Sequence, residues 1–180
     1  LCLEQLNNII DYQPTDMTIT VEAGMSLSQL QAVLGENGQW LPLDPPKPEQ
    51  VTVGGLIATN LSGPSRLSQG TIRDFLIGLT VVRADGSVIK GGGRVVKNVA
   101  GYDLAKLYCG SFGTLGVIVD ATFMIRPRPA AQAIFTLQSA SAELAMQTAL
   151  QQIHTHLQPF FLDLASFDPV NTANGQAGFQ

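Results

Sequence analysis

Apolar and polar positions in the first part of the chain follow spacings that predict a helix, a strand and a second helix. Apolar residues at positions 3, 6, 9 and 10 predict one or two helical turns over Leu3–Ile10. Strict alternation predicts a strand over Met17–Ala23. Helical spacing returns over Leu27–Leu34, where Ser26 is the expected N-cap and glycines follow the last turn. Trp40–Pro48 contains four prolines and predicts an ordered loop.

The middle of the chain predicts a β-hairpin, a short helix and a long strand. Phe75–Val82 and Val88–Lys90 are apolar runs separated by an Asp-Gly turn, which is a strong hairpin pattern. Leu104–Tyr108 predicts a short helix with Asp103 as its cap. Val117–Ile125 is apolar throughout most of its length and predicts a long strand.

Pro129 marks a predicted domain boundary, because two Arg-Pro pairs break the chain there. Beyond it, Ala133–Leu137 predicts a strand, Ser141–His156 a helix and Pro159–Leu164 another strand. This β-α-β order predicts the start of a second, α+β domain.

Residues 51–63, VTVGGLIATNLSG, form an apolar segment that is unusually rich in glycine and in small polar residues. Interpreted as an apolar strand, the segment is weakened by Gly54 and Gly55, at about 0.5–1 kcal/mol each relative to alanine. Such a pair indicates close approach of a ligand or of another backbone segment. The alternative is a tight strand-to-turn transition. Hydroxyl and amide groups stand nearby in the sequence, on Thr52, Thr59, Asn60 and Ser62.

Gly110–Gly116, GSFGTLG, is a second glycine-dense segment, and it precedes a predicted strand. The dinucleotide-binding fingerprint has the reverse order, since its glycines follow a strand and open a helix. The triplet Gly91–Gly93 is completed neither to that fingerprint nor to a phosphate-binding loop. The sequence therefore disfavours both a Rossmann domain and a P-loop nucleoside triphosphatase.

The composition favours a folded protein without a nucleic-acid or membrane-spanning surface. The 180 residues are 45% hydrophobic and 13% charged, which supplies a core and argues against disorder. The net charge of −4 disfavours nucleic acid, and no apolar run reaches the ~20 residues of a membrane span. No secretory signal is visible, so Cys2 and Cys109 are expected as free thiols in a reducing compartment. We also expect a chain cut at both ends, as it begins and ends without a complete element.

Groups for acid–base or metal chemistry are sparse. The only histidines, His154 and His156, are two residues apart on a predicted helix and point to different sides, so they are poor joint metal ligands. No serine or cysteine nucleophile has a base placed by the sequence. No metal ligand and no catalytic residue is assigned. Glycine-rich segments without an acid–base set fit a protein whose cofactor carries the chemistry.

Four blocks in this order and spacing resemble one family. They are LPLDPP (41–46), TVGGLIATNLSG (52–63), RVVKNVAGYDLAKL (94–107) and GSFGTLGVI (110–118). Together they resemble the PCMH-type FAD-binding domain of the vanillyl-alcohol oxidase family, and in particular the FAD-binding E subunit of bacterial glycolate oxidase. The resemblance covers about residues 1–130. It implies an α+β fold, with 1–129 a PCMH-type FAD-binding domain lacking its N-terminal subdomain and 130–180 the start of an α+β cap domain.

The resemblance also implies a set of cofactor-binding residues. Asp44, Thr52, Val53, Gly54 and Gly55 would lie along the flavin and the pyrophosphate. Ala58, Thr59, Asn60, Ser62 and Gly63 would continue that wall. Gly110, Gly113 and Gly116 would pass beside the FAD, with Val117 and Ile118 toward its adenine or ribityl side. Lys97, Asn98 and Gly101–Asp103 match a block typical of the 2-hydroxy-acid branch, with no atomic role assigned.

The chain departs from the family pattern in three places. The family's glycine-rich pyrophosphate loop would precede residue 1, no histidine or cysteine stands where some members attach the flavin covalently, and Phe112 replaces a frequent glutamate. The implied function is that of an FAD-binding component of a 2-hydroxy-acid (glycolate) oxidase or dehydrogenase. Its implied partners are a catalytic flavoprotein subunit and an iron–sulfur subunit, in the cytoplasm or at a membrane through those partners. The alternative is a non-catalytic remnant or interaction module that does not hold FAD by itself.

Overall fold

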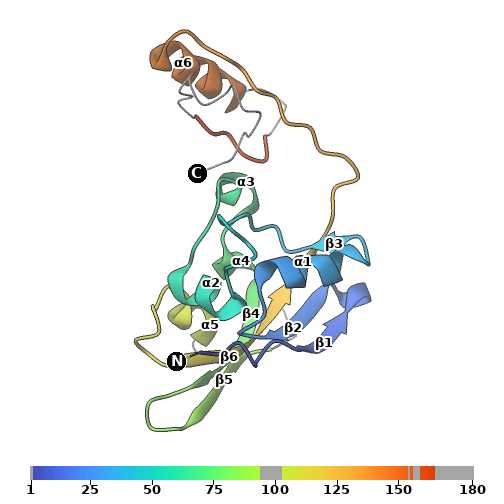
Figure 1. Cartoon of the computed structure of the whole chain (residues 1–180), viewed down its shortest axis with the longest axis vertical. Coiled ribbons are helices and arrows are strands. Elements are labelled where there is room, and N and C mark those ends of the chain that lie inside the picture. Colours follow the sequence, from blue (N-terminus) through green and yellow to red (C-terminus); the bar gives the residue numbers. More distant parts are fainter. Residues whose placement is uncertain (1, 94–102, 154, 156–158, 165–180) are drawn as a thin grey trace. The chain divides into compact units, whose positions relative to one another are not determined.

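The computed structural model describes residues 2–93, 103–153, 155 and 159–164 (Figure 1). The chain divides into two compact units, Leu1–Ala133 and Ile134–Gln180. The first unit holds both glycine-dense segments, and the second holds one described helix, α6 (Ala142–Ile153). The block at residues 94–102, which includes Lys97, Asn98 and Gly101, lies outside the described residues.

Unit 1 is a mixed structure of strands and short helices, which confirms the α+β class. Its elements are β1 (Ile9–Gln13), the 3-10 helix η1 (Pro14–Asp16), β2 (Thr18–Glu22), α1 (Leu27–Gly35), β3 (Gln39–Trp40), α2 (Val53–Thr59), α3 (Arg66–Gln69), α4 (Ile72–Phe75), β4 (Leu76–Val82), β5 (Val88–Gly92), α5 (Leu104–Tyr108), β6 (Val117–Met124) and β7 (Arg126–Pro127).

The main sheet has the strand order β1-β2-β6-β4-β5, and every neighbouring pair is antiparallel (Figure 1). β1 with β2 and β4 with β5 form hairpins, and β6, the last of the five in sequence, inserts between the two hairpins. β3 and β7 form a separate two-stranded ribbon. The central place of β6 explains its apolar composition, since both of its edges and one face are covered.

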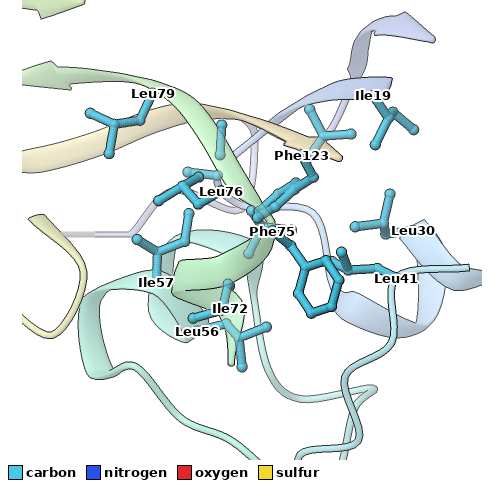
Figure 2. Close-up of a cluster of buried hydrophobic side chains, with 14 of the residues drawn as sticks. Ile19, Leu30, Leu41, Leu56, Ile57, Ile72, Phe75, Leu76, Leu79 and Phe123 are labelled. Carbon is cyan, nitrogen blue, oxygen red and sulfur yellow. The ribbon is translucent and has the colours of Figure 1, made fainter. Parts of the chain in front are cut away.

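One face of the sheet is apolar and carries the core. Ile19 on β2, Phe123 on β6 and Leu76 on β4 are opposite one another in the register, and all three are buried. Figure 2 shows the helix side chains that pack over this face, among them Leu56 and Ile57 of α2. Burial of large aliphatic and aromatic side chains contributes roughly 1.5–3 kcal/mol each, so this cluster is the main source of stability.

The predicted helix at Leu3–Ile10 is wrong. Only one turn forms there, with the Leu6 amide donating to the Leu3 carbonyl at 2.8 Å, and β1 begins at Ile9. The segment instead pairs with the end of β2, since the Gly24 amide donates to Leu6 and the Glu22 amide donates to Asn8. Long-range pairing has overridden a weak local helical spacing.

The other predictions for unit 1 agree closely with the structure. The strand predicted at Met17–Ala23 is β2, and the helix predicted from Leu27 is α1, with Ser26 accepting from the Gln29 amide as its N-cap. The hairpin is β4–β5, although Phe75 belongs to α4. α5 follows Asp103, whose carboxylate accepts from the Lys106 amide.

The interpretation of residues 51–63 as a strand is wrong, because Val53–Thr59 is the helix α2. Its two glycines are tolerated because Thr52 caps the helix and because Val53, Leu56 and Ile57 bury an apolar face. Beyond Pro129, the described residues at 133–137 and 159–164 form no strand, so the predicted β-α-β order is not seen there. No helix within the described ranges is long and apolar enough to cross a membrane.

Asp74 lies in the first turn of α4 and bonds back to the N-cap residue Thr71, which gives a pH-dependent prediction. Its carboxylate accepts from the Thr71 amide at 2.7 Å and from the Thr71 hydroxyl at 3.0 Å. The hydrogen bond from the Thr71 amide holds the pKa of Asp74 below its ordinary value. A depressed pKa in the folded state contributes stability above the pKa of the unfolded chain, and the contribution is lost as the pH falls through the folded pKa.

We therefore expect Asp74→Asn to lower the free energy of unfolding by about 0.5 kcal/mol at pH 7, a small effect because the carboxylate is largely exposed and screened. The difference from the wild type should shrink as the pH falls below about 4 and passes through the lowered pKa of Asp74. Urea denaturation at a series of pH values measures it. A difference that stayed constant down to pH 2 would show that the charge of Asp74 has no role in the cap.

Candidate functional site

Helix α2 is anchored to the end of β2 through its first amides. The Val53 amide donates to the Met25 carbonyl at 2.8 Å, and the Gly54 amide donates to the Ala23 carbonyl at 2.7 Å. The Gly55 amide donates to the Thr52 hydroxyl at 3.2 Å. These amides, which would otherwise attract an anion at a helix N-terminus, are therefore engaged within the protein.

The glycines of this segment serve different purposes. A Cβ on Gly54 would lie 2.9 Å from the Cβ of Ala23, so this glycine permits close packing of helix on strand. Gly55 is exposed, and a Cβ there would approach only the Thr52 hydroxyl, at 3.1 Å. Of the two causes considered for the glycine pair, approach of another backbone segment applies to Gly54.

Asp44 connects the proline-rich loop to the segment after α2. Its carboxylate accepts from the Ser65 amide at 3.0 Å and from the Ser65 hydroxyl at 2.6 Å. Gly63 is buried against the same loop, and a Cβ there would overlap the carbonyl oxygen and Oδ1 of Asp44. Asp44 and Gly63, both predicted site residues, are thus neighbours 19 positions apart in sequence.

The C-terminal end of α2 meets the second glycine-dense segment. The Gly110 amide donates to the Ile57 carbonyl at 2.9 Å, and the Phe112 amide donates to the Ala58 carbonyl at 2.8 Å. In addition, the Cys109 thiol donates to Asn60 Oδ1 at 3.3 Å. The two glycine-dense segments singled out from the sequence therefore lie side by side. We call residues 57–62 with 109–113 the α2 junction.

Left-handed backbone conformations concentrate at the α2 junction. Asn60, which caps the C-terminus of α2, has φ 53°, and Gly110 and Gly113 have φ 80° and 74°. Phe112 also has φ 53°, and its side chain is 71% exposed. A bulky residue with positive φ and an exposed apolar ring is unusual, and such outliers cluster at functional sites.

Two serine hydroxyls of the α2 junction have no hydrogen-bond partner. Ser62 Oγ and Ser111 Oγ are both buried, and each lacks a donor or acceptor within the part of the chain that the structure describes. A buried unpaired hydroxyl costs about 1–3 kcal/mol, so it calls for an explanation. Two positions after Ser111, a Cβ on Gly113 would have no atom of the described chain within 4 Å apart from its own sequence neighbours. Unpaired hydroxyls beside open, glycine-lined backbone fit a ligand with hydrogen-bonding edges.

Gly116, Val117 and Ile118 lie where the chain enters β6. Gly116 has φ 156°, and a Cβ there would lie 2.6 Å from a methyl carbon of Val81. Val117 and Ile118 begin β6, opposite Val82 and Val81 on β4. Because Ile118 is buried, its side chain supports the sheet.

Cys109 is a half-buried thiol at the α2 junction, and it should react more slowly than Cys2. Burial raises its pKa, partly offset by Arg73. Cys2 is exposed, and both cysteines are free, as the sequence predicted. We expect a disulfide reagent at pH 8 to modify Cys2 at least about tenfold faster than Cys109, because the thiolate is the reactive form. The absorbance of the thiol released from the reagent should rise in two phases over time, and Cys2→Ser should remove the fast phase. A single fast phase with two equivalents would contradict the buried position of Cys109.

Metal chemistry has no support from the described ranges, in which no group of three or more histidine, cysteine, aspartate or glutamate side chains could hold an ion. The sequence reasoning missed Ser111, because it carried over the glycines of GSFGTLG and passed over the small polar residue between them. It also left Cys109 out of the site, although that residue directly precedes the glycine-dense segment.

Comparison with known proteins places these features in a family. Residues 1–92 match a family model described as an FAD binding domain. The chain is 40% identical over 153 residues to glycolate oxidase subunit GlcE of Escherichia coli (strain K12), covering 84% of this chain and 42% of that protein. It is 33% identical over 163 residues to glycolate oxidase subunit GlcD of Bacillus subtilis (strain 168), covering 91% of this chain and 35% of that protein. It is 36% identical over 165 residues to a mitochondrial D-lactate dehydrogenase (cytochrome) of Arabidopsis thaliana, covering 89% of this chain and 29% of that protein.

These matches confirm the resemblance based on the four sequence blocks. The chain spans less than half the length of the curated relatives it matches.

Proposed function

Because this chain belongs to the family of PCMH-type FAD-binding domains, we propose that it forms the FAD-binding part of a flavin-dependent oxidoreductase acting on small 2-hydroxy acids. Three named activities among its relatives support this substrate class: glycolate oxidase, D-lactate dehydrogenase and D-2-hydroxyglutarate dehydrogenase. All three substrates carry a hydroxyl on the carbon next to a carboxylate. The chemistry that FAD supplies when bound is acceptance of a hydride from that carbon.

The observation that supports FAD binding best is the α2 junction. Two distant segments are held together there by three hydrogen bonds, and they carry two buried hydroxyls without partners. The residues present fit a ligand with polar edges and a flat apolar body, since Phe112 and Leu61 are exposed beside those hydroxyls. Flavin and adenine rings with their sugar-like chains match this description.

The predicted site residues take three roles in this proposal. At the α2 junction, Ala58, Thr59, Asn60, Ser62, Gly110 and Gly113 line the cofactor. Asp44 and Gly63 hold the proline-rich loop against the junction, and Thr52, Val53, Gly54 and Gly55 fix α2 on β2. Gly116, Val117 and Ile118 support the junction from the sheet. Among the residues that the structure describes, we assign no proton-transferring group.

We further propose that residues 1–129 are the FAD-binding domain and that 130–180 begin the cap domain. The relatives that are named subunits of glycolate oxidase favour a multi-subunit enzyme, in which this chain works beside a catalytic flavoprotein subunit and an iron–sulfur subunit that relays electrons. The second candidate function is a non-catalytic module that retains the fold without FAD. It is favoured by the amides of Val53, Gly54 and Gly55 at the start of α2, which are engaged within the protein and so are not free to bind the pyrophosphate.

An assay of the complete protein purified with its co-expressed neighbouring subunits tests the proposed function. We expect glycolate, D-lactate or D-2-hydroxyglutarate to reduce an added redox dye, and acids lacking the 2-hydroxyl to be inactive. The matched control is propionate against D-lactate, since the two differ only in that hydroxyl. A complex that retains flavin but reduces no dye with any 2-hydroxy acid would contradict the substrate class.

A further inference from the structure

The guanidinium of Arg126 is exposed, yet it is held in place from two sides. Its Cζ lies 5.2 Å from the centroid of the Phe75 ring, which is a cation–π distance. Its Nη1 donates to Gln69 Oε1 at 3.3 Å. Phe75 is 1% exposed and belongs to the core shown in Figure 2, so the guanidinium rests on a fixed base. The two contacts orient a planar group at the end of a long, otherwise flexible side chain.

A continuous set of hydrogen bonds connects this guanidinium to the proline-rich loop. Asp44 accepts from the Ser65 hydroxyl at 2.6 Å, and the Gln69 amide donates to the Ser65 carbonyl at 2.9 Å. The side-chain oxygen of Gln69 then accepts from Arg126. The side-chain nitrogen of Gln69 donates to the Ser68 hydroxyl at 3.3 Å, which fixes the orientation of the amide. Arg126 is therefore joined, through two intermediate residues, to the loop that supports the proposed cofactor site.

Arg126 has hydrogen-bonding capacity to spare and no carboxylate partner in the part of the chain that the structure describes. A guanidinium has five N–H donors, and Gln69 accepts from one nitrogen only. The ion pairs among the described residues join other side chains, Arg83 with Asp85 and Lys106 with Asp103. The free donors of Arg126 fit an acceptor that comes from outside this domain.

The charges near this guanidinium favour an anion as that acceptor. Residues 50–73 and 121–142, which include α3, β7 and the start of α4, contain four arginines and no aspartate or glutamate. Asp44, in the same set of contacts, and Asp74, next to Phe75, both accept hydrogen bonds within the protein. Neither carboxylate is bonded to the guanidinium.

We propose that Arg126 binds the carboxylate of the 2-hydroxy acid substrate. This inference rests on the proposed function and adds to it a residue that recognises the charged end of the substrate. A guanidinium presents two parallel N–H groups to a carboxylate, which makes the contact strong and directional. Because Phe75 and Gln69 already hold the side chain, little of its conformational freedom is lost on binding.

A separation of KM from kcat tests the proposal in the complete protein assembled with its neighbouring subunits. Arg126→Gln should raise the KM for D-lactate about 100-fold and change kcat by less than about threefold, because a contact made equally before and during the reaction is lost. The inhibition constant of propionate, which keeps the carboxylate and lacks the hydroxyl, should rise by a similar factor. The matched control is Arg83→Gln, which removes an exposed arginine paired with Asp85 and should leave both constants unchanged.

Arg126→Lys covers the case in which Arg126→Gln does not fold, because it keeps a cation over Phe75. It should raise both constants about tenfold, since an ammonium cannot form two parallel hydrogen bonds. Flavin content, measured by absorbance, should equal that of the wild type in every folded variant.

Unchanged constants in a folded Arg126 variant would overturn the proposal, and so would a loss of kcat at unchanged KM. A variant that keeps its KM but separates from its partner subunit on size-exclusion chromatography would also overturn it, by showing that the carboxylate belongs to the partner. A wild-type complex that holds flavin and oxidises no 2-hydroxy acid would instead overturn the proposed function, and this inference with it.

Discussion

Replacing Gly63 with alanine is expected to lower the free energy of unfolding by more than about 3 kcal/mol. The added Cβ would overlap the carbonyl oxygen and Oδ1 of Asp44. Asp44 cannot yield easily, because the Ser65 amide and hydroxyl both donate to its carboxylate. The loop of residues 41–46 would have to separate from residues 62–65, and the support of the α2 junction would be lost. FAD affinity should fall together with stability.

Gly35→Ala is the matched control for this substitution. Gly35 is the last residue of α1, its φ is not positive, and a Cβ there would meet no atom within 4 Å from the described chain outside its own helix and sequence neighbours. Alanine there should be neutral or stabilising by up to about 1 kcal/mol, because glycine weakens a helix. Urea denaturation of both variants gives the comparison. A Gly63→Ala protein as stable as the wild type would show that Asp44 and Gly63 do not pack together.

Phe123→Ala is expected to lower the free energy of unfolding by about 3–5 kcal/mol, the usual range for deleting a buried phenyl ring. Phe123 is fully buried on the central strand β6, opposite Ile19 on β2 and Leu76 on β4 (Figure 2). The cavity would lie in the apolar face on which α2 packs, so the effect should reach the α2 junction. The loss is expected both in the midpoint of urea unfolding and in the melting temperature.

Phe112→Ala provides the contrast, because it removes the same ring from an exposed position. The side chain of Phe112 is 71% exposed, and exposed substitutions usually change stability by within about 0.5 kcal/mol. If Phe123→Ala were as mild as Phe112→Ala, the sheet register that places Phe123 in the core would be wrong.

Local sequence patterns predicted most of unit 1 because several of its elements begin or end at a clear helix cap or turn. Ser26 and Asp103 each cap the helix that follows them, and the Asp-Gly turn sets the β4–β5 hairpin. The segment at Leu3–Ile10 had only an apolar spacing and no cap, so its pairing with the end of β2 decided its structure. Such long-range pairing is not visible in a single sequence.

Residues 51–63 show more clearly where prediction from local sequence patterns fails. Within Val53–Thr59, two adjacent glycines and three β-branched residues argue against a helix by propensity, yet α2 forms there. The reason is tertiary: Gly54 fits against Ala23, and the Thr52 hydroxyl caps the first turn. The inference that glycine marks a close approach was useful for finding the segment, while the partner of that approach needed the structure.

The proximity of the two glycine-dense segments is seen in the structure, whereas their role in a site stays a prediction. The sequence singled out the two glycine-dense segments, and the structure joins them through Gly110, Phe112 and Cys109. Ser111 escaped prediction because serine is common and has no spacing of its own. Its importance appears only when its burial and its missing partner are known.

The measurement that tests the central claim most directly is the visible absorption spectrum of the complete purified protein, followed by titration of the cofactor-free form with FAD. Our account predicts the flavin absorption bands and saturable, one-to-one quenching of flavin fluorescence, weakened by Ser62→Ala and Ser111→Ala. A folded protein, verified by circular dichroism, that showed no flavin bands and no saturable quenching would contradict FAD binding at the α2 junction.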